Sequence, residues 1–379
     1  VGCNEGNPPV SLEKPLEEYV KSVHLQVGYI PSSAEYGVGG HGPYGVKSSS
    51  FYFSHLNDKL HSEKGMPNVM NYESLCRTLS PKNLWPQNIA WGEHDYTIHG
   101  AQNGQSFNDV LFQHFGDAHN ARQFTEQAQW LNYDGYRAMY ESAEENRLGL
   151  LIWMSHPCWP TMVWQTYDYY LEPTAAYFGV RKACEPLHVQ FNPVKKVVEV
   201  VNLRGNQKDL TVKVQILDMY GKILSEKTVD VAIGEDETKD VLPLILPDEN
   251  VYYIRLKLFS KKHLISENFY VEGKEENNWQ ALNTLPEISI KKVEKFRRVG
   301  NEYKGIVTIW NPNTTPALMI RLNLVRSGGE QILPVVYSDN YFHLMPGERK
   351  TVDVSYKLVD GMGDRPHVEI TGFNLSKDQ

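Results

Sequence analysis

Hydrophobic and polar positions along this chain follow two different patterns, and the change comes near residue 187. Before that point, short apolar runs alternate with segments in which apolar residues recur at helical spacing. This spacing predicts helices over residues 11–23 and 122–147, each with one apolar face. The apolar runs predict strands over residues 24–30, 59–63, 88–94 and 148–154. Alternating strands and helices are typical of parallel β/α units, so we expect an α/β fold for residues 1–187.

From residue 188 onward the apolar residues recur at every second position. The clearest runs are residues 210–216, 252–258 and 318–324, and turn residues such as Tyr220-Gly221 and Pro346-Gly347 separate neighbouring runs. Short alternating strands with frequent turns predict β-sandwiches. The length is sufficient for two, which we assign to residues 188–283 and 284–379, with a polar connection between them.

Composition narrows the classes of function. The chain of 379 residues has a net charge of -8, which argues against a nucleic-acid or anionic-membrane partner. No apolar run approaches the ~18 residues of a membrane-spanning helix. The four cysteines have no zinc-like spacing, so we expect buried free thiols, no metal and no cofactor. They are Cys3, Cys76, Cys158 and Cys184.

Two glutamates follow apolar runs that the pattern predicts to be strands. Glu5 comes directly after a run that reads as the end of a strand, and Glu63 ends the strand predicted over 59–63. Strand ends of a parallel barrel point into one mouth, so both carboxylates would meet there. Glycoside hydrolysis needs such a pair, ~5–5.5 Å apart in retaining enzymes. The alternative is that each glutamate is an ordinary solvated surface residue.

Three segments then carry a resemblance to a known family. "CNEGNPP" and "LHSEKGMPNVMNYESL" resemble the acid/base and nucleophile motifs of family-2 glycoside hydrolases. "LIWMSHPCWP" and the residues after it are similar to the exo-β-glucosaminidase and β-mannosidase-like branch. The resemblance implies the later strands of a partial (β/α)8 TIM barrel, followed by two immunoglobulin-like β-sandwiches. It further implies that the chain is a C-terminal fragment of a secreted or periplasmic enzyme.

The resemblance also implies roles for individual residues. Glu5 would be the general acid/base and Glu63 the nucleophile of a retaining exo-β-glycosidase. Asn4 would hydrogen-bond the sugar 2-position, and Trp153 would form the floor on which the ring stacks. The glucosaminidases of this branch carry a more acidic or hydroxylated pair in place of Asn4-Glu5. A neutral asparagine suits a 2-hydroxyl better than a 2-ammonium, so we expect a neutral hexoside.

Three further residues are candidates for the sugar pocket. Tyr44 lies in the Gly-rich segment "GGHGPYG", which we interpret as an active-site loop, because no strand-GxGxxG-helix context supports a phosphate cradle. Trp91 and His94, in "WGEHDY", could line the pocket. Core packing or helix capping is the alternative for both.

Two other functional hypotheses remain open at this point. The sandwiches could be carbohydrate-binding or structural modules beside an inert barrel remnant, or the chain could be a degenerate homologue. Retention of both Glu5 and Glu63 argues against degeneration. A partial barrel would leave unpaired strand edges, so we expect the isolated fragment to be inactive and to self-associate. We expect a β-glycoside as its carbohydrate partner, and neither a nucleic acid nor a membrane.

Overall fold

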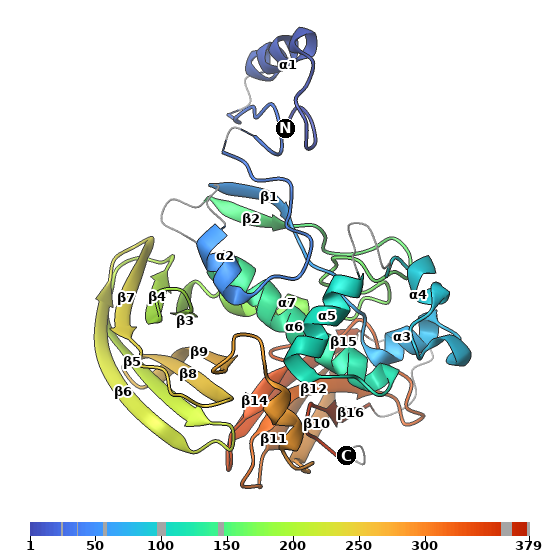
Figure 1. Cartoon of the computed structure of the whole chain (residues 1–379), viewed down its shortest axis with the longest axis vertical. Helices are drawn as coiled ribbons and strands as arrows, with labels where there is room; N and C mark the ends of the chain where they lie inside the picture. Colours follow the sequence, from blue (N-terminus) through green and yellow to red (C-terminus); the bar gives the residue numbers. More distant parts are fainter. Residues whose placement is uncertain are drawn as a thin grey trace.

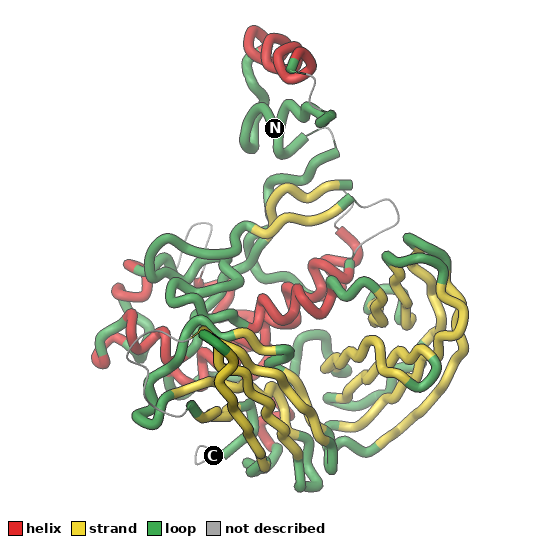
Figure 2. Tube along the Cα trace, turned by 180° about the vertical axis from the view of Figure 1, so that it is seen from behind, coloured by secondary structure: helices red, strands yellow, loops and turns green. Residues whose placement is uncertain are grey.

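The structure is a computed structural model that describes residues 1–23, 26–35, 37–55, 59–96, 104–142, 148–357 and 366–376. Its helices are α1 (Val10–Ser22), α2 (Ser49–His55), α3 (Tyr72–Thr78), η1 (Pro81–Asn83), α4 (Ile89–Glu93), α5 (Gly104–Phe115), α6 (Ala121–Glu141), α7 (Ala175–Ala183) and η2 (Gln280–Thr284). Helices α5, α6 and α7 lie at the centre, between α1, β1 and β2 at one end and two β-rich regions at the other (Figure 1). The view from behind shows the same helical layer with strands beside and below it (Figure 2).

The α/β part contains a set of parallel backbone pairings. Strand β1 (Leu60–Lys64) runs parallel to β2 (Gly149–Ile152), and further parallel bridges join Cys3 to Ser32 and Val38 to Leu60. Because parallel neighbours end at the same edge, the residues that follow these pairings converge. This arrangement carries the segment after Cys3 and the end of β1 to one place.

Two of the predicted strands are wrong. Residues 89–93 form helix α4, because the Asn88 side chain accepts a hydrogen bond from the Ala90 backbone N–H and caps the helix start. In the segment predicted over 24–30, the described residues 26–30 form no strand, and residues 24 and 25 lie outside the described part. The long predicted helix is confirmed as α6, and residues 143–147 of that prediction are outside the description.

Helix α1 confirms a predicted helix, but its apolar face is not covered. Leu12, Leu16 and Tyr19 are 54%, 41% and 67% exposed, and the helix contains no buried residue. Figure 1 shows α1 extending from the top of the molecule. The prediction of buried cysteines is also wrong, since Cys3 is half-buried and the other three are exposed; all four are free thiols.

The two β-rich regions each consist of two facing antiparallel sheets. Their strands are β3 (Leu187–Asn192), β4 (Val197–Asn202), β5 (Gln207–Asp218), β6 (Ile223–Ile233), β7 (Glu237–Pro243), β8 (Tyr252–Ser260) and β9 (His263–Glu272), then β10 (Lys291–Val299), β11 (Glu302–Trp310), β12 (Ala317–Val325), β13 (Val336–Tyr337), β14 (Phe342–Leu344), β15 (Arg349–Lys357) and β16 (His367–Thr371). The two sheets of the first region have the strand orders β3-β4-β7 and β6-β5-β8-β9. Those of the second region have the orders β10-β11-β15-β13 and β14-β12-β16. Alternating burial along β5 confirms the period of two.

Strand β12 departs from that alternation because all nine of its residues are buried. Its second face packs against the helical region instead of facing water. Arg321 on this face forms ion pairs with Glu73 of α3 at 2.9 Å and with Glu172 at 2.5 Å. One apolar core therefore runs from the helices into the second sandwich and includes Trp130 and Trp279, whose ring centroids are 5.5 Å apart.

Candidate functional site

Glu5 and Glu63 meet at a single hydroxyl group. The Tyr44 hydroxyl lies 2.8 Å from Glu63 Oε1 and 3.1 Å from Glu5 Oε1, so it can donate to either carboxylate. The two distances together place these two carboxylate oxygens no more than about 6 Å apart, a limit that the ~5–5.5 Å spacing of retaining glycosidases satisfies. Glu63 is 7% exposed, whereas the side chain of Glu5 is 39% exposed.

Short loops hold the Glu5 segment against its neighbours. The Ser33 hydroxyl accepts a hydrogen bond from the Glu5 N–H at 2.8 Å and donates to Asn4 Oδ1 at 3.1 Å. Ser62, one residue before Glu63, donates to the Ser33 carbonyl at 2.6 Å. A Cβ at Gly40 would lie 2.2 Å from that same carbonyl, so only glycine fits. Sequence reasoning missed Ser33, because its role comes from neighbours in space and no local motif marks it.

The surroundings give Glu63 an unusual proton affinity. Burial raises the pKa of Glu63, and the nearby Glu5 carboxylate raises it further, while the Tyr44 hydrogen bond acts in the opposite direction. Burial and the two carboxylates raise the pKa of Tyr44 far above its ordinary value, so the phenol keeps its proton and remains a donor. His41 Nδ1 lies 3.9 Å from Glu5 Oε1 at the exposed side.

One tryptophan ring borders this group, and a second tryptophan lies at the end of β2. The Tyr44 and Trp164 rings are 5.1 Å apart, and the buried Trp164 Nε1 has no hydrogen-bond partner among the described residues. Trp153 follows β2, donates its backbone N–H to the Lys64 carbonyl at 2.9 Å, and is 45% exposed. Trp164 has no counterpart in the sequence prediction, since it lies in an irregular segment whose path only the fold defines.

The other two predicted pocket residues lie on and beside helix α4. Trp91 is 1% exposed, donates to the Asn83 carbonyl and packs against Phe124 in the core. His94 contacts the Pro160 carbonyl through Nδ1 at 2.6 Å and stacks on Trp159. Within the described residues, no hydrogen bond or ring contact connects either side chain with the carboxylate pair.

Among the described residues, no group of three or more His, Cys, Asp or Glu side chains is placed to hold a metal ion. None of the described helices is both long and apolar enough to cross a membrane.

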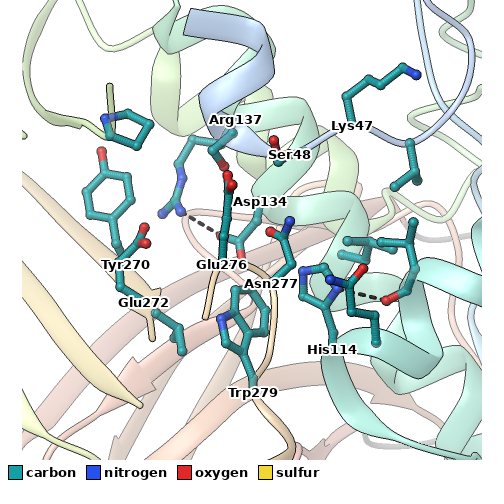
Figure 3. Close-up of a pocket in the computed structure, with 18 residues that line it drawn as sticks. Lys47, Ser48, His114, Asp134, Arg137, Tyr270, Glu272, Glu276, Asn277 and Trp279 are labelled. Atoms are coloured by element: carbon teal, nitrogen blue, oxygen red, sulfur yellow. Dashed lines mark hydrogen bonds and ion pairs between the residues drawn. The ribbon is translucent and has the colours of Figure 1, made fainter. Parts of the chain in front are cut away.

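A separate polar cavity lies where α5 and α6 meet the first sandwich (Figure 3). Its volume is about 90 Å³. Asp134 and Arg137 of α6, which line it, form an ion pair at 2.6 Å, and Glu272 and Glu276 lie beside them. Burial, Asp134 and Glu276 raise the pKa of Glu272 to about 8, although Arg137 acts against them. This cavity contains neither Glu5 nor Glu63.

Known domain families match the β-rich part of the chain. Residues 268–375 match the exo-β-D-glucosaminidase Ig-fold domain, and residues 196–272 match the mannosidase Ig/CBM-like domain. Two solved structures share the fold over nearly the whole chain. An exo-chitosanase from Amycolatopsis orientalis, at 22% identity, has a TM-score of 0.87, covering 98% of this chain and 50% of its own. A β-D-mannosidase from Dictyoglomus thermophilum, at 19% identity, has a TM-score of 0.70, covering 95% and 44%.

Curated relatives extend this similarity to sequence. An exo-β-D-glucosaminidase from Hypocrea jecorina is 30% identical over 84% of this chain and 39% of its own length. A second, from Amycolatopsis orientalis, is 28% identical over 81% and 33%, and a mannosylglycoprotein endo-β-mannosidase from Lilium longiflorum is 26% identical over 77% and 38%. The chain thus spans well under half the length of these relatives. It is homologous, over most of its length, to exo-β-D-glucosaminidases and β-mannosidases of glycoside hydrolase family 2.

Proposed function

Starting from this homology, we propose that the chain is the C-terminal part of a retaining exo-β-glycosidase. The observation that carries the proposal is the shared Tyr44 hydroxyl, which keeps the facing oxygens of Glu5 and Glu63 within about 6 Å. This limit is satisfied by the ~5–5.5 Å separation of carboxyl groups in retaining enzymes, and the retaining mechanism itself comes from the proposed family relationship.

The two carboxylates have different roles in the proposed reaction. The Glu63 carboxylate attacks the anomeric carbon of the terminal sugar and forms a glycosyl ester, while Glu5 donates its proton to the departing glycosidic oxygen. In the second step Glu5 takes a proton from water, and the water oxygen attacks the same carbon and releases Glu63. The greater exposure of Glu5 suits a group that meets the leaving group and the water.

Neighbouring residues would orient the sugar and the nucleophile. Tyr44 donates to Glu63 and favours its ionised form, against the burial that disfavours it. Asn4, fixed by Ser33, would hydrogen-bond the 2-position, and Trp153 would stack under the ring. Trp91 and His94 remain predicted pocket residues without an observed link to the carboxylates.

The same proposal includes the architecture around the site. The parallel pairings of β1 and β2, and the bridges at Cys3 and Val38, support the later strands of a (β/α)8 barrel within residues 1–187. Residues 188–283 and 284–379 would be the two immunoglobulin-like sandwiches. We further propose that the whole enzyme is secreted or periplasmic and acts on a carbohydrate β-glycoside.

Two kinds of sugar are candidates for the terminal residue of the substrate. Asn4 favours a neutral hexoside, whereas the names of the relatives point to glucosamine. The test is to express the full-length gene product and screen it against 4-nitrophenyl β-mannoside, galactoside, glucoside, glucuronide and glucosaminide. We expect hydrolysis of one glycoside, with release of the β-anomer first, and its loss in both Glu5→Gln and Glu63→Gln. Glucosaminide hydrolysis alone would refute the argument from Asn4, and inactivity on all five would refute the proposed function.

A second experiment tests whether the 379-residue chain is active without the rest of the enzyme. We expect the isolated 379-residue chain to be inactive, because its subsite would lack contacts that a longer enzyme provides. Turnover of an aryl β-glycoside by the purified chain, lost in Glu63→Gln, would contradict this expectation.

A further inference from the structure

One sheet of the second sandwich has an outer face with an excess of basic side chains. The sheet has the order β10-β11-β15-β13. In its antiparallel register Arg297 lies directly opposite Lys304, and Lys295 lies opposite Ile306. Like charges facing each other across two strands destabilise a sheet. Lys304 forms an ion pair with Glu302 at 3.6 Å. Among the described residues, no ion pair includes Lys295 or Arg297.

The register shows that the excess extends over the whole face. Side chains at every second position of a strand share one face, and paired residues on neighbouring strands share it too. The basic members of this face are Lys291, Lys295, Arg297, Lys304, Arg349 and Lys357, and the acidic members are Glu302 and Asp353. Since the chain as a whole has a net charge of -8, this face is a local concentration of positive charge. We call it the basic face.

A hollow is formed where the basic face meets helix α7. Its volume is about 870 Å³, and Tyr177 and Arg181 of α7 line it together with Lys295, Arg297 and Lys304. The Arg181 guanidinium donates to the Tyr337 carbonyl at 2.9 Å, which fixes this edge of the hollow. Figure 1 places β10 and β11 of this sheet at the end of the molecule opposite α1 and β1, the strand that contains Glu63.

We propose that the basic face binds an anionic polysaccharide, at a site separate from the carboxylate pair. Carboxylate or sulfate groups along such a chain would pair with the uncompensated Lys295 and Arg297 and relieve their repulsion with neighbouring cations. Aliphatic side chains between the cations, such as Ile306 and Val336, are exposed at 53% and 68% and offer apolar contact to the C–H faces of sugar rings. The choice of a glycan rests on the proposed function; the preference for an anion does not.

The composition of the basic face favours a glycan over a single-stranded nucleic acid. Single-stranded nucleic acids need aromatic platforms on which bases stack. Among the paired residues of β10, β11 and β15, the aromatic side chain on this face is Trp310. The Arg349 guanidinium lies over its ring at 5.1 Å and so occupies the surface on which a base would stack. A polycationic glycan would be repelled.

The test measures binding of the purified 379-residue chain to polygalacturonate by retardation in affinity gels and by calorimetry, at low and high salt. Neutral dextran, single-stranded DNA and anionic phospholipid vesicles serve as comparison ligands. The test variant combines Lys295→Gln, Arg297→Gln and Lys304→Gln. The matched control combines Lys208→Gln, Lys222→Gln and Lys227→Gln, which removes the same charge from exposed positions of the first sandwich.

We expect salt-sensitive binding to polygalacturonate that weakens about tenfold or more in the test variant and stays unchanged in the control variant. Absence of binding by the wild-type chain, or equal weakening in both variants, would overturn the proposal. Tighter binding to DNA or vesicles than to polygalacturonate would overturn the glycan assignment. The Glu63→Gln chain should bind normally, so failure here is distinguishable from failure of the proposed enzyme activity.

Discussion

Replacement of Glu272 by glutamine should make the stability of this chain less sensitive to pH. The carboxyl group lies in the polar cavity between α6 and the first sandwich, where burial, Asp134 and Glu276 raise its pKa from 4.5 to about 8 (Figure 3). The folded chain therefore holds this proton more tightly than the unfolded chain does. Its stabilising contribution is fully present below the unfolded pKa and is lost as the pH rises through about 8.

The magnitude follows from this difference in pKa. Each pH unit between the two pKa values changes the free energy of unfolding by about 1.4 kcal/mol per proton. Between pH 6 and pH 8, Glu272 should thus lower the free energy of unfolding of the wild-type chain by about 2 kcal/mol. The change per pH unit becomes smaller as the pH approaches the pKa of the folded chain. Glutamine has a similar shape and no proton to lose. The stability advantage of Glu272→Gln should therefore grow by about 2 kcal/mol over this range, a shift of about 2–3 °C in Tm.

The assay is thermal and urea unfolding at several pH values, followed by tryptophan fluorescence. Trp279 lines the same cavity and reports on it directly. The matched control is Glu249→Gln, an exposed glutamate of the same sandwich, which should give no pH-dependent difference. A constant difference between Glu272→Gln and wild type from pH 6 to pH 8 would refute the reasoning, because it would mean that Glu272 does not titrate between them.

Three further predictions concern other parts of the molecule. Arg137→Met should lower the free energy of unfolding by roughly 3–5 kcal/mol, since it leaves the buried carboxylates around it without their cation; a loss below 1 kcal/mol in urea unfolding would contradict this. In the full-length enzyme, Tyr44→Phe should move the acidic limb of the kcat/KM profile to higher pH, because it removes the hydrogen bond that lowers the pKa of Glu63; an unchanged or lowered limb would be inconsistent with this role. Because the apolar face of α1 is uncovered, we expect it to contribute to self-association of the isolated chain. Light scattering should report a smaller species for Leu16→Glu but not for Leu264→Glu, a similarly exposed position on the first sandwich, and a monomeric wild type would disprove this.

Much of the architecture was determined by local sequence pattern. The alternation along residues 210–216 predicted a half-buried strand, and β5 confirms it, because a period of two has one solution on a pleated strand. The periodicity of residues 122–147 predicted α6 for the same kind of reason. The prediction of a strand over 88–94 was wrong, since residues 89–93 form helix α4, whose first turn is capped by the Asn88 side chain. Burial of both faces of β12 also could not be predicted, since Glu73 and Glu172 come from distant segments.

For the candidate site, the sequence by itself identified Glu5 and Glu63 as carboxylates at the ends of apolar runs, and motif order related them to each other. Only the tertiary structure decided that one phenol, Tyr44, bridges both carboxylates, and that Ser33 holds the Glu5 backbone. Only it placed Trp91 in the core and brought Trp164 beside Tyr44. The physical reason is that a pattern along the chain records which residues are apolar or charged, whereas distances, burial and pKa shifts depend on which distant segments pack together.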